Sequence, residues 1–156
     1  MTTIAWDGKT LAVDAQANRA DMVRHAIKYR RIPPDHPVEL VTGAGAVMAA
    51  TGSLEYGLAL FSWVLDDRMD PAKWPQFQAD RNDWCRLIIV SKTRAMHYEM
   101  LPHAQDMLDQ FGAFGSGRDF AMGAMAMGAD ATRAVETASR FDVHTGPIVH
   151  SIRVRD

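Results

Sequence analysis

The sequence predicts a single α+β domain with antiparallel sheets, and three observations support this prediction. Strand-like segments precede and follow segments of helical periodicity, in the order strands, helix, strands, helices, strand. Asp7-Gly8 separates two strand-like runs, which is typical of a tight β-hairpin. The 156 residues are enough for one hydrophobic core and contain no internal repeat or linker, so we assign 1–156 to one domain.

Two strand pairs and a long helix are expected in the first half of the chain. The first pair consists of IAWD and TLAVDAQ, within residues 4–17. The second pair consists of IKYRRI and PVELVTG, with prolines between them. After Gly45 the period changes, and apolar residues at helical spacing predict a helix over much of 47–66: Leu54, Leu58, Phe61 and Leu65.

The second half is expected to begin with a polar loop, 66–83, that contains two prolines and a short helix. The runs RLIIV and AMHYEM are predicted strands, the latter because apolar and polar residues alternate. The glycine-rich FGAFGSG leads into a helix, RDFAMGAMAMG, and Asp130 is the predicted N-cap of a further helix. GPIVHSIRV is the predicted closing strand.

The composition excludes several classes of protein. A formal net charge of −2 gives no electrostatic footprint for nucleic acid or for an anionic membrane. No apolar stretch approaches the ~20 residues that a membrane-spanning helix needs, and the N-terminus lacks the pattern of a secretory signal. Cys85 is the single cysteine, so we expect a buried, unpaired thiol and a cytoplasmic, reducing location.

Metal, cofactor and nucleotide sites are not expected. The six histidines show no metal-ligand spacing and are interpreted as surface or satisfied polar residues. The GSG around Ser116 lacks the lysine and the spacing of a P-loop, which argues against a phosphate site.

Thr2 is the most informative candidate for chemistry. Removal of Met1, which is common before a small residue, would leave Thr2 with a hydroxyl and a free amine. The α-amine has an unperturbed pKa of about 7.7–8.0 and can act as the base for the hydroxyl. The competing interpretation is that Thr2 only begins a strand, where threonine is common.

Other residues could support a nucleophile at Thr2. Asp14 lies on the strand predicted to pair with the N-terminal one, and Lys28 is the only lysine between positions 10 and 72. A buried ammonium held by a carboxylate would favour the alkoxide and lower the pKa of the amine. Gly45, predicted at a strand-to-helix junction, could offer its N–H to a developing oxyanion.

With these residues in place, the sequence resembles a proteasome β-type subunit of the N-terminal-nucleophile hydrolase superfamily over nearly its whole length. It is also similar to the peptidase component of the bacterial two-part ATP-dependent protease. The similarity rests on the opening, the lysine strand, a glycine-rich turn, the Gly-Ser-Gly turn with its helix, and the closing segment: TTIAWDGKTLAVDAQ, IKYRRI, TGAGAVMAA, GAFGSGRDFAMGAMAMG and SRFDVHTGPIVHSI.

The resemblance implies a four-layer αββα sandwich of two antiparallel sheets flanked by helices. It implies Thr2 as nucleophile with its own amine as base, Lys28 as the activating cation and Asp14 as its orienting partner. Gly45 would donate the oxyanion hydrogen bond. Ser116 would position the amine and relay protons, supported by the pair Asp142 and Thr145.

The implied function is hydrolysis of peptide bonds in unfolded polypeptides, inside stacked homo-oligomeric rings served by an ATP-driven unfoldase. Neither a cofactor nor a metal is implied. Two alternatives stay open. One is a catalytically silent ring protein that retains Met1, which would acylate the amine needed as base. The other is a small-substrate amidase of the same superfamily, in a smaller oligomer.

Overall fold

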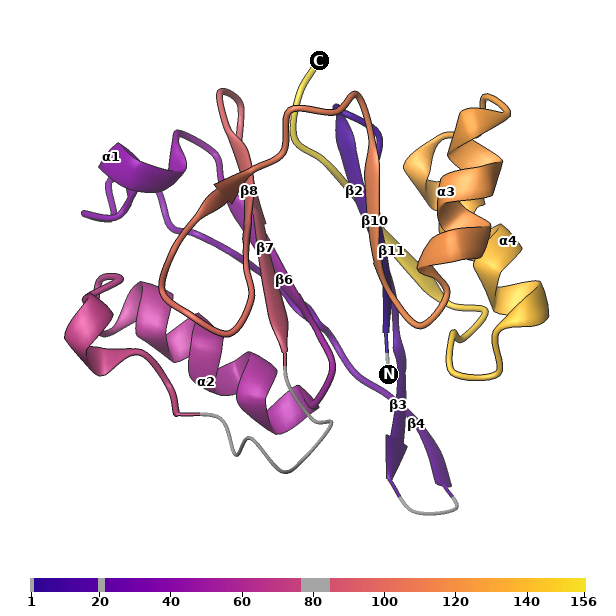
Figure 1. Ribbon diagram of the computed structural model, residues 1–156, viewed down its shortest axis with the longest axis horizontal. Coiled ribbons are helices and arrows are strands. Elements are labelled where there is room, and N and C mark those ends of the chain that lie inside the picture. The colour runs from indigo at the N-terminus through magenta and orange to yellow at the C-terminus, as the bar shows by residue number, and fades with distance from the viewer. Residues whose placement is uncertain (1, 20–21, 77–84) are drawn as a thin grey trace. The chain divides into compact units, whose positions relative to one another are not determined.

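The computed structural model describes residues 2–19, 22–76 and 85–156, which form two compact units (Figure 1). Unit 1 comprises residues 1–28 and 109–156, and unit 2 comprises residues 29–108. Each unit combines an antiparallel sheet with helices, so the predicted α+β class is confirmed. The assignment of the whole chain to one domain stays a prediction.

The sheet of unit 1 has four antiparallel strands in the order β10-β1-β2-β11. Their bounds are Gly112–Gly115, Thr3–Trp6, Thr10–Asp14 and Val149–Arg153. The predicted hairpin is confirmed: β1 pairs with β2, and Asp7 Oδ1 accepts the N–H groups of Lys9 and Thr10 in the turn. The closing strand predicted in GPIVHSIRV is β11, which pairs with β2.

Two helices, α3 (Arg118–Ala126) and α4 (Ala131–Phe141), cover one face of this sheet (Figure 1). Ala5 and Ala12 of the sheet pack in one cluster with small residues of α4, which lets the helix approach closely. Both helices were predicted, and Asp130 caps α4 by accepting the N–H of Arg133 at 2.8 Å.

The segment TLAVDAQ is not one strand, as predicted, but parts of two. β2 ends at Asp14, and β3 (Gln16–Arg19) then forms a two-stranded ribbon with β4 (Met22–His25). Ala15 separates the two strands, and across it the side chain of Asp14 accepts the N–H of Gln16 at 3.1 Å. Sequence periodicity does not reveal such a side-chain bond.

Unit 2 contains a five-stranded antiparallel sheet in the order β5-β6-β7-β8-β9. The strand bounds are Tyr29–Arg31, Val47–Thr51, Arg86–Val90, Ala95–Tyr98 and Gln105–Asp106. Helix α2 (Leu54–Leu65) lies along β6 and β7 (Figure 1). Its buried residues, among them Leu60 and Trp63, pack in one cluster with Leu87 of β7. The strands predicted in RLIIV and AMHYEM are β7 and β8.

Two predictions for unit 2 are wrong. The helix predicted over much of 47–66 is present as α2, but residues 47–51 form the strand β6 rather than its start. The start was misplaced because this fully buried run has no alternation that would mark it as a strand. The predicted strand PVELVTG instead contains the short helix α1 (Glu39–Thr42). Gly45 therefore precedes a strand, and the strand-to-helix junction lies at Gly52, whose φ is +93°.

The polar loop contains the expected short helix, η1 (Pro71–Lys73), capped by the side chain of Asp70. Positions 77–84 lie outside the described residues. Cys85 is buried, as expected, and its thiol donates to the carbonyl of Ser53 at 3.0 Å. Among the described helices, none combines the length and the apolar character needed to cross a membrane.

Candidate active site at the N-terminal strand

Asp14 is a fully buried carboxylate at the end of β2. It accepts the N–H of Thr3 at 2.8 Å, and its other oxygen accepts the N–H groups of Gln16 and Gly146 at 3.1 and 3.0 Å. These donors come from the three segments that meet at this end of the sheet. Asp14 thus joins the first strand, the start of β3 and the segment before β11, which fixes the position of its carboxylate.

Lys28 completes the surroundings of Asp14. Its Nζ lies 3.2 and 3.3 Å from the two carboxylate oxygens, and its side chain is only 4% exposed. Burial lowers the pKa of Lys28 from its usual value, and the attraction and hydrogen bonding of Asp14 offset this only in part. An ammonium in this setting loses its proton more readily than a solvated lysine does.

Thr2 lies beside this ion pair and is itself buried. The N–H of Thr3 and the Nζ of Lys28 contact the same oxygen of Asp14, at 2.8 and 3.2 Å, so these two nitrogens are within about 6 Å of each other. The peptide that joins Thr2 to Thr3 is therefore close to the buried cation. The predicted trio of Thr2, Asp14 and Lys28 is brought together.

The Gly-Ser-Gly turn holds the other side of Thr2. The N–H of Ser116 donates to the carbonyl of Thr2 at 3.1 Å. Gly115 makes this approach possible: its φ is +97°, and a Cβ there would lie 1.6 Å from the carbonyl oxygen of Thr2. The glycine is required both by the backbone angle and by the space.

Ser116 and Thr145 both bond to one carboxylate. Their hydroxyls donate to the same oxygen of Asp142, each at 2.5 Å, and the N–H of His144 donates to its other oxygen at 3.1 Å. Burial alone would raise the pKa of Asp142, but these hydrogen bonds outweigh it, so the pKa lies below its usual value. Asp142 is thus held as a carboxylate at neutral pH.

Thr3 belongs to the same network, although the sequence does not single it out. Its Oγ1 lies 2.6 Å from that of Thr145 and accepts the N–H of Gly117 at 2.9 Å. Because the proton of Thr145 is used toward Asp142, Thr3 must donate to Thr145. The hydrogen bonds therefore all point the same way: Thr3 donates to Thr145, and Thr145 donates to Asp142.

Gly45 is the one predicted site residue outside unit 1. Its φ of +66° suits glycine, and the aliphatic chain of Lys92 lies close by, 3.5 Å from where a Cβ would stand. The prediction placed Gly45 before the first long helix, but β6 separates the two. Gly52, at the actual strand-to-helix junction, was missed because the strand was read as helix.

The described residues hold no group of three or more histidine, cysteine, aspartate or glutamate side chains placed to bind a metal ion. What unit 1 does assemble is a buried cation, two carboxylates with defined hydrogen-bond donors, and three hydroxyls, all around the start of β1. Such a set can tune the proton affinity of a group at the chain end.

No protein-family model matches the sequence, and no curated protein matches it either. Solved structures are similar in fold. BPH of Thiobacillus denitrificans, in complex with epoxomicin, has a TM-score of 0.65 and 19% identity, covering 97% of this chain and 96% of that one. HslV from Trypanosoma brucei has a TM-score of 0.63 and 22% identity, with all of both chains covered.

Anbu from a Hyphomicrobium species, strain MC1, is also similar, with a TM-score of 0.65 and 10% identity. That similarity covers 98% of this chain and 81% of the Anbu chain. At these identities the likeness is one of fold. The chain shares its α+β fold with HslV, BPH and Anbu over nearly its entire length.

Proposed function

We propose that this chain is a threonine-type peptidase subunit of the N-terminal-nucleophile hydrolase superfamily, with Thr2 as nucleophile. One observation carries the proposal: the buried Lys28–Asp14 pair lies beside the peptide that joins Thr2 to Thr3. Burial of an ammonium costs desolvation free energy, and the activation of a nearby N-terminal threonine is a chemical role that accounts for a charge at this position. The fold shared with HslV and BPH agrees with this proposal.

The proposed reaction begins once Met1 is removed. The free amine of Thr2 takes the proton of the hydroxyl as Oγ1 attacks the peptide carbonyl, and then gives that proton to the leaving amine. Water next attacks the resulting ester and passes a proton to the amine, which releases the carboxylic acid and restores the hydroxyl. The same amine thus serves as base and acid in both halves.

Lys28 and Ser116 would act on the two reacting groups of Thr2. The ammonium of Lys28 favours the negative charge that forms on the hydroxyl oxygen, and Asp14 keeps that ammonium in place. The proton of Ser116 is directed to Asp142, which leaves the oxygen of Ser116 available as an acceptor for the amine. Thr145 supports this by sharing the carboxylate.

The oxyanion donor has two candidates. Gly45 remains the prediction from the sequence. Gly52 is the second, because the resemblance associates this role with the glycine turn before the first helix, and the structure has that junction there. Ser53, the N-cap residue of α2, makes no side-chain capping bond, so its hydroxyl does not occupy the first backbone N–H groups of α2 next to Gly52.

The substrates proposed from the resemblance are unfolded polypeptides, and the proposed setting is a stacked homo-oligomeric ring in the cytoplasm, served by an ATP-driven unfoldase. Such an enclosure would keep folded proteins away from the nucleophile.

Intact-mass spectrometry and peptide cleavage test the proposal together. We expect a chain mass without Met1, cleavage of an unfolded protein by the wild type, and inhibition by epoxomicin, which is bound in the similar BPH structure. Thr2→Ala should abolish cleavage, whereas Thr2→Ser, which keeps a hydroxyl, should retain part of it.

Substantial cleavage by Thr2→Ala would refute the nucleophile assignment. A retained Met1 together with absent cleavage would favour the silent ring homologue instead. Cleavage of small amides but not of polypeptides would favour the amidase.

A further inference from the structure

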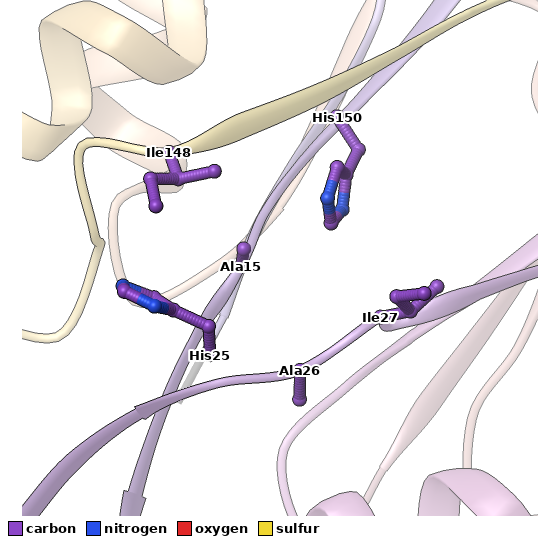
Figure 2. Close-up of a pocket in the computed structure, with 6 residues that line it drawn as sticks. All are labelled: Ala15, His25, Ala26, Ile27, Ile148 and His150. Atoms are coloured by element: carbon purple, nitrogen blue, oxygen red, sulfur yellow. The ribbon is translucent and has the colours of Figure 1, made fainter.

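Unit 1 has an open pocket of about 180 Å³ that the proposed mechanism does not use. Figure 2 shows its lining: Ala15, His25, Ala26, Ile27, Ile148 and His150. They come from three segments: Ala15 directly follows β2, His25 ends β4 and is followed by Ala26 and Ile27, and Ile148 and His150 flank the first residue of β11. Backbone bonds hold these segments together, from Ala26 to Ala15 at 2.8 Å and from Ala15 to Ile148 at 2.9 Å.

The strand register places this pocket next to Thr2. Ile4 is opposite Val13, and Asp14 is opposite Val149. Continued by two residues, the register between β1 and β2 puts Thr2 opposite Ala15. The pairing of Ala15 with Ile148 follows in the same way and agrees with the bond between them. The wall of the pocket therefore begins one strand away from the proposed nucleophile.

A second connection comes from the chain itself. Ala15 directly follows Asp14, and Ile27 directly precedes Lys28, so the pocket backs onto the buried ion pair. A molecule bound in the pocket would lie beside both the N-terminal strand and the cation. This position suits a part of the substrate close to the bond that is cleaved.

The lining selects for apolar groups. Four of its six side chains are aliphatic, and Ile27 and Ile148 are 57% and 45% exposed, so they offer contact area to a ligand. A cavity of about 150 Å³ is known to hold a benzene molecule, so this pocket has room for a phenyl or branched aliphatic group. A lysine side chain would meet two imidazoles and the nearby ammonium of Lys28.

We propose that this pocket binds an apolar side chain of the substrate, of leucine or phenylalanine size, from a residue adjoining the scissile bond. The proposal rests on the proposed function, since it takes Thr2 as the reacting residue. It assigns Ile27, Ile148 and Ala26 as the residues that set the preference.

Binding to the Thr2→Ala protein tests the pocket without turnover. Peptides identical except for one residue, either Phe, Leu, Gly or Lys, are compared by fluorescence anisotropy, with that residue on either side of the bond in turn. We expect Phe and Leu peptides to bind at least about tenfold more tightly than the Gly peptide on one side. The methyl NMR signals of Ile27 and Ile148 should shift on binding.

Variants of the lining give the matched comparison. Ile148→Ala removes one wall and Ala26→Leu fills the space, and each should weaken binding of the Phe peptide about tenfold. Leu40→Ala, at a residue on α1 that is 97% exposed, should leave it unchanged. Because Ile148 is half exposed, its truncation should leave the fold intact, which circular dichroism would verify.

Equal affinity for all four peptides, an absence of binding, or methyl shifts that bypass Ile27 and Ile148 would overturn the pocket assignment. The two proposals fail separately. Cleavage without side-chain preference would support the peptidase proposal and refute the pocket assignment. Selective binding without any cleavage by the wild type would support the pocket assignment and refute the peptidase proposal.

Discussion

At the scale of single residues, the buried lysine determines how this protein should respond to alkaline pH. The pKa of Lys28 lies below its ordinary value of 10.5, because burial outweighs the attraction of Asp14. Between the two pKa values the unfolded chain holds one more proton than the folded chain. In that window the contribution of Lys28 to the free energy of unfolding rises with pH.

We predict opposite trends for stability and rate in that window. The cation is lost above the lowered pKa, so the cleavage rate should fall before pH 10.5 is reached. The free energy of unfolding of the wild type minus that of Lys28→Met should rise with pH, by at most about 1.4 kcal/mol per pH unit. Denaturation and rate profiles from about pH 7 upward measure both. A constant difference over this range would contradict the lowered pKa.

The residues of the site differ in how far sequence could predict them. Lys28 and Asp14 could be paired from their chemistry and from the hairpin, since β1 and β2 are adjacent in sequence. Thr3 could not, because a threonine in a strand is ordinary and its bond to Thr145 joins positions 142 residues apart. The direction of the hydroxyl protons follows only from the distances to Asp142.

At the scale of elements, capping and turn signals predicted the structure better than apolar periodicity did. The Asp7-Gly8 hairpin and the Asp130 cap both depend on local hydrogen bonds that the sequence shows directly. Helix and strand were confused at 47–51, where every residue is buried and neither period is visible. That confusion also displaced the predicted strand-to-helix junction from Gly52 to Gly45.

Two glycines provide a matched test of the turn between β10 and α3. Gly115→Ala would place a methyl group 1.6 Å from the carbonyl oxygen of Thr2, at a φ of +97°. We expect a loss of about 3 kcal/mol or more in the free energy of unfolding, and loss of cleavage, because the chain must move. Gly123→Ala, in α3 with nothing within 4 Å, should stabilise by about 0.5–1 kcal/mol.

Urea denaturation and cleavage of a common peptide measure both glycine variants. A Gly115→Ala protein as stable and as active as the wild type would show that β1 does not need this close approach. A destabilised Gly123→Ala protein would show that its neighbourhood is more crowded than the structure has it.

At the scale of the whole molecule, the proposed nucleophile depends on segments that are distant in sequence. Four parts of the chain meet in unit 1 around one strand end: Thr2, the Asp14–Lys28 pair, the turn at Ser116 and the segment 142–146. Local patterns could not predict that meeting, because it is produced by the pairing of β1 with β10 and of β2 with β11. The hairpin and the chemistry of the side chains already suggested Asp14 and Lys28 as partners of Thr2. Only the resemblance to a known family implied that Ser116, Asp142 and Thr145 join them.

Assembly should be independent of the chemistry at Thr2. The Oγ1 of Thr2 is the group removed in Thr2→Ala, whereas its carbonyl, which bonds to Ser116, remains. We therefore expect Thr2→Ala and wild type to form the same large homo-oligomer, measured by light scattering and native mass spectrometry. Because the proposed ring encloses the site, a monomer or dimer that cleaves unfolded polypeptides would contradict the ring while leaving the nucleophile standing.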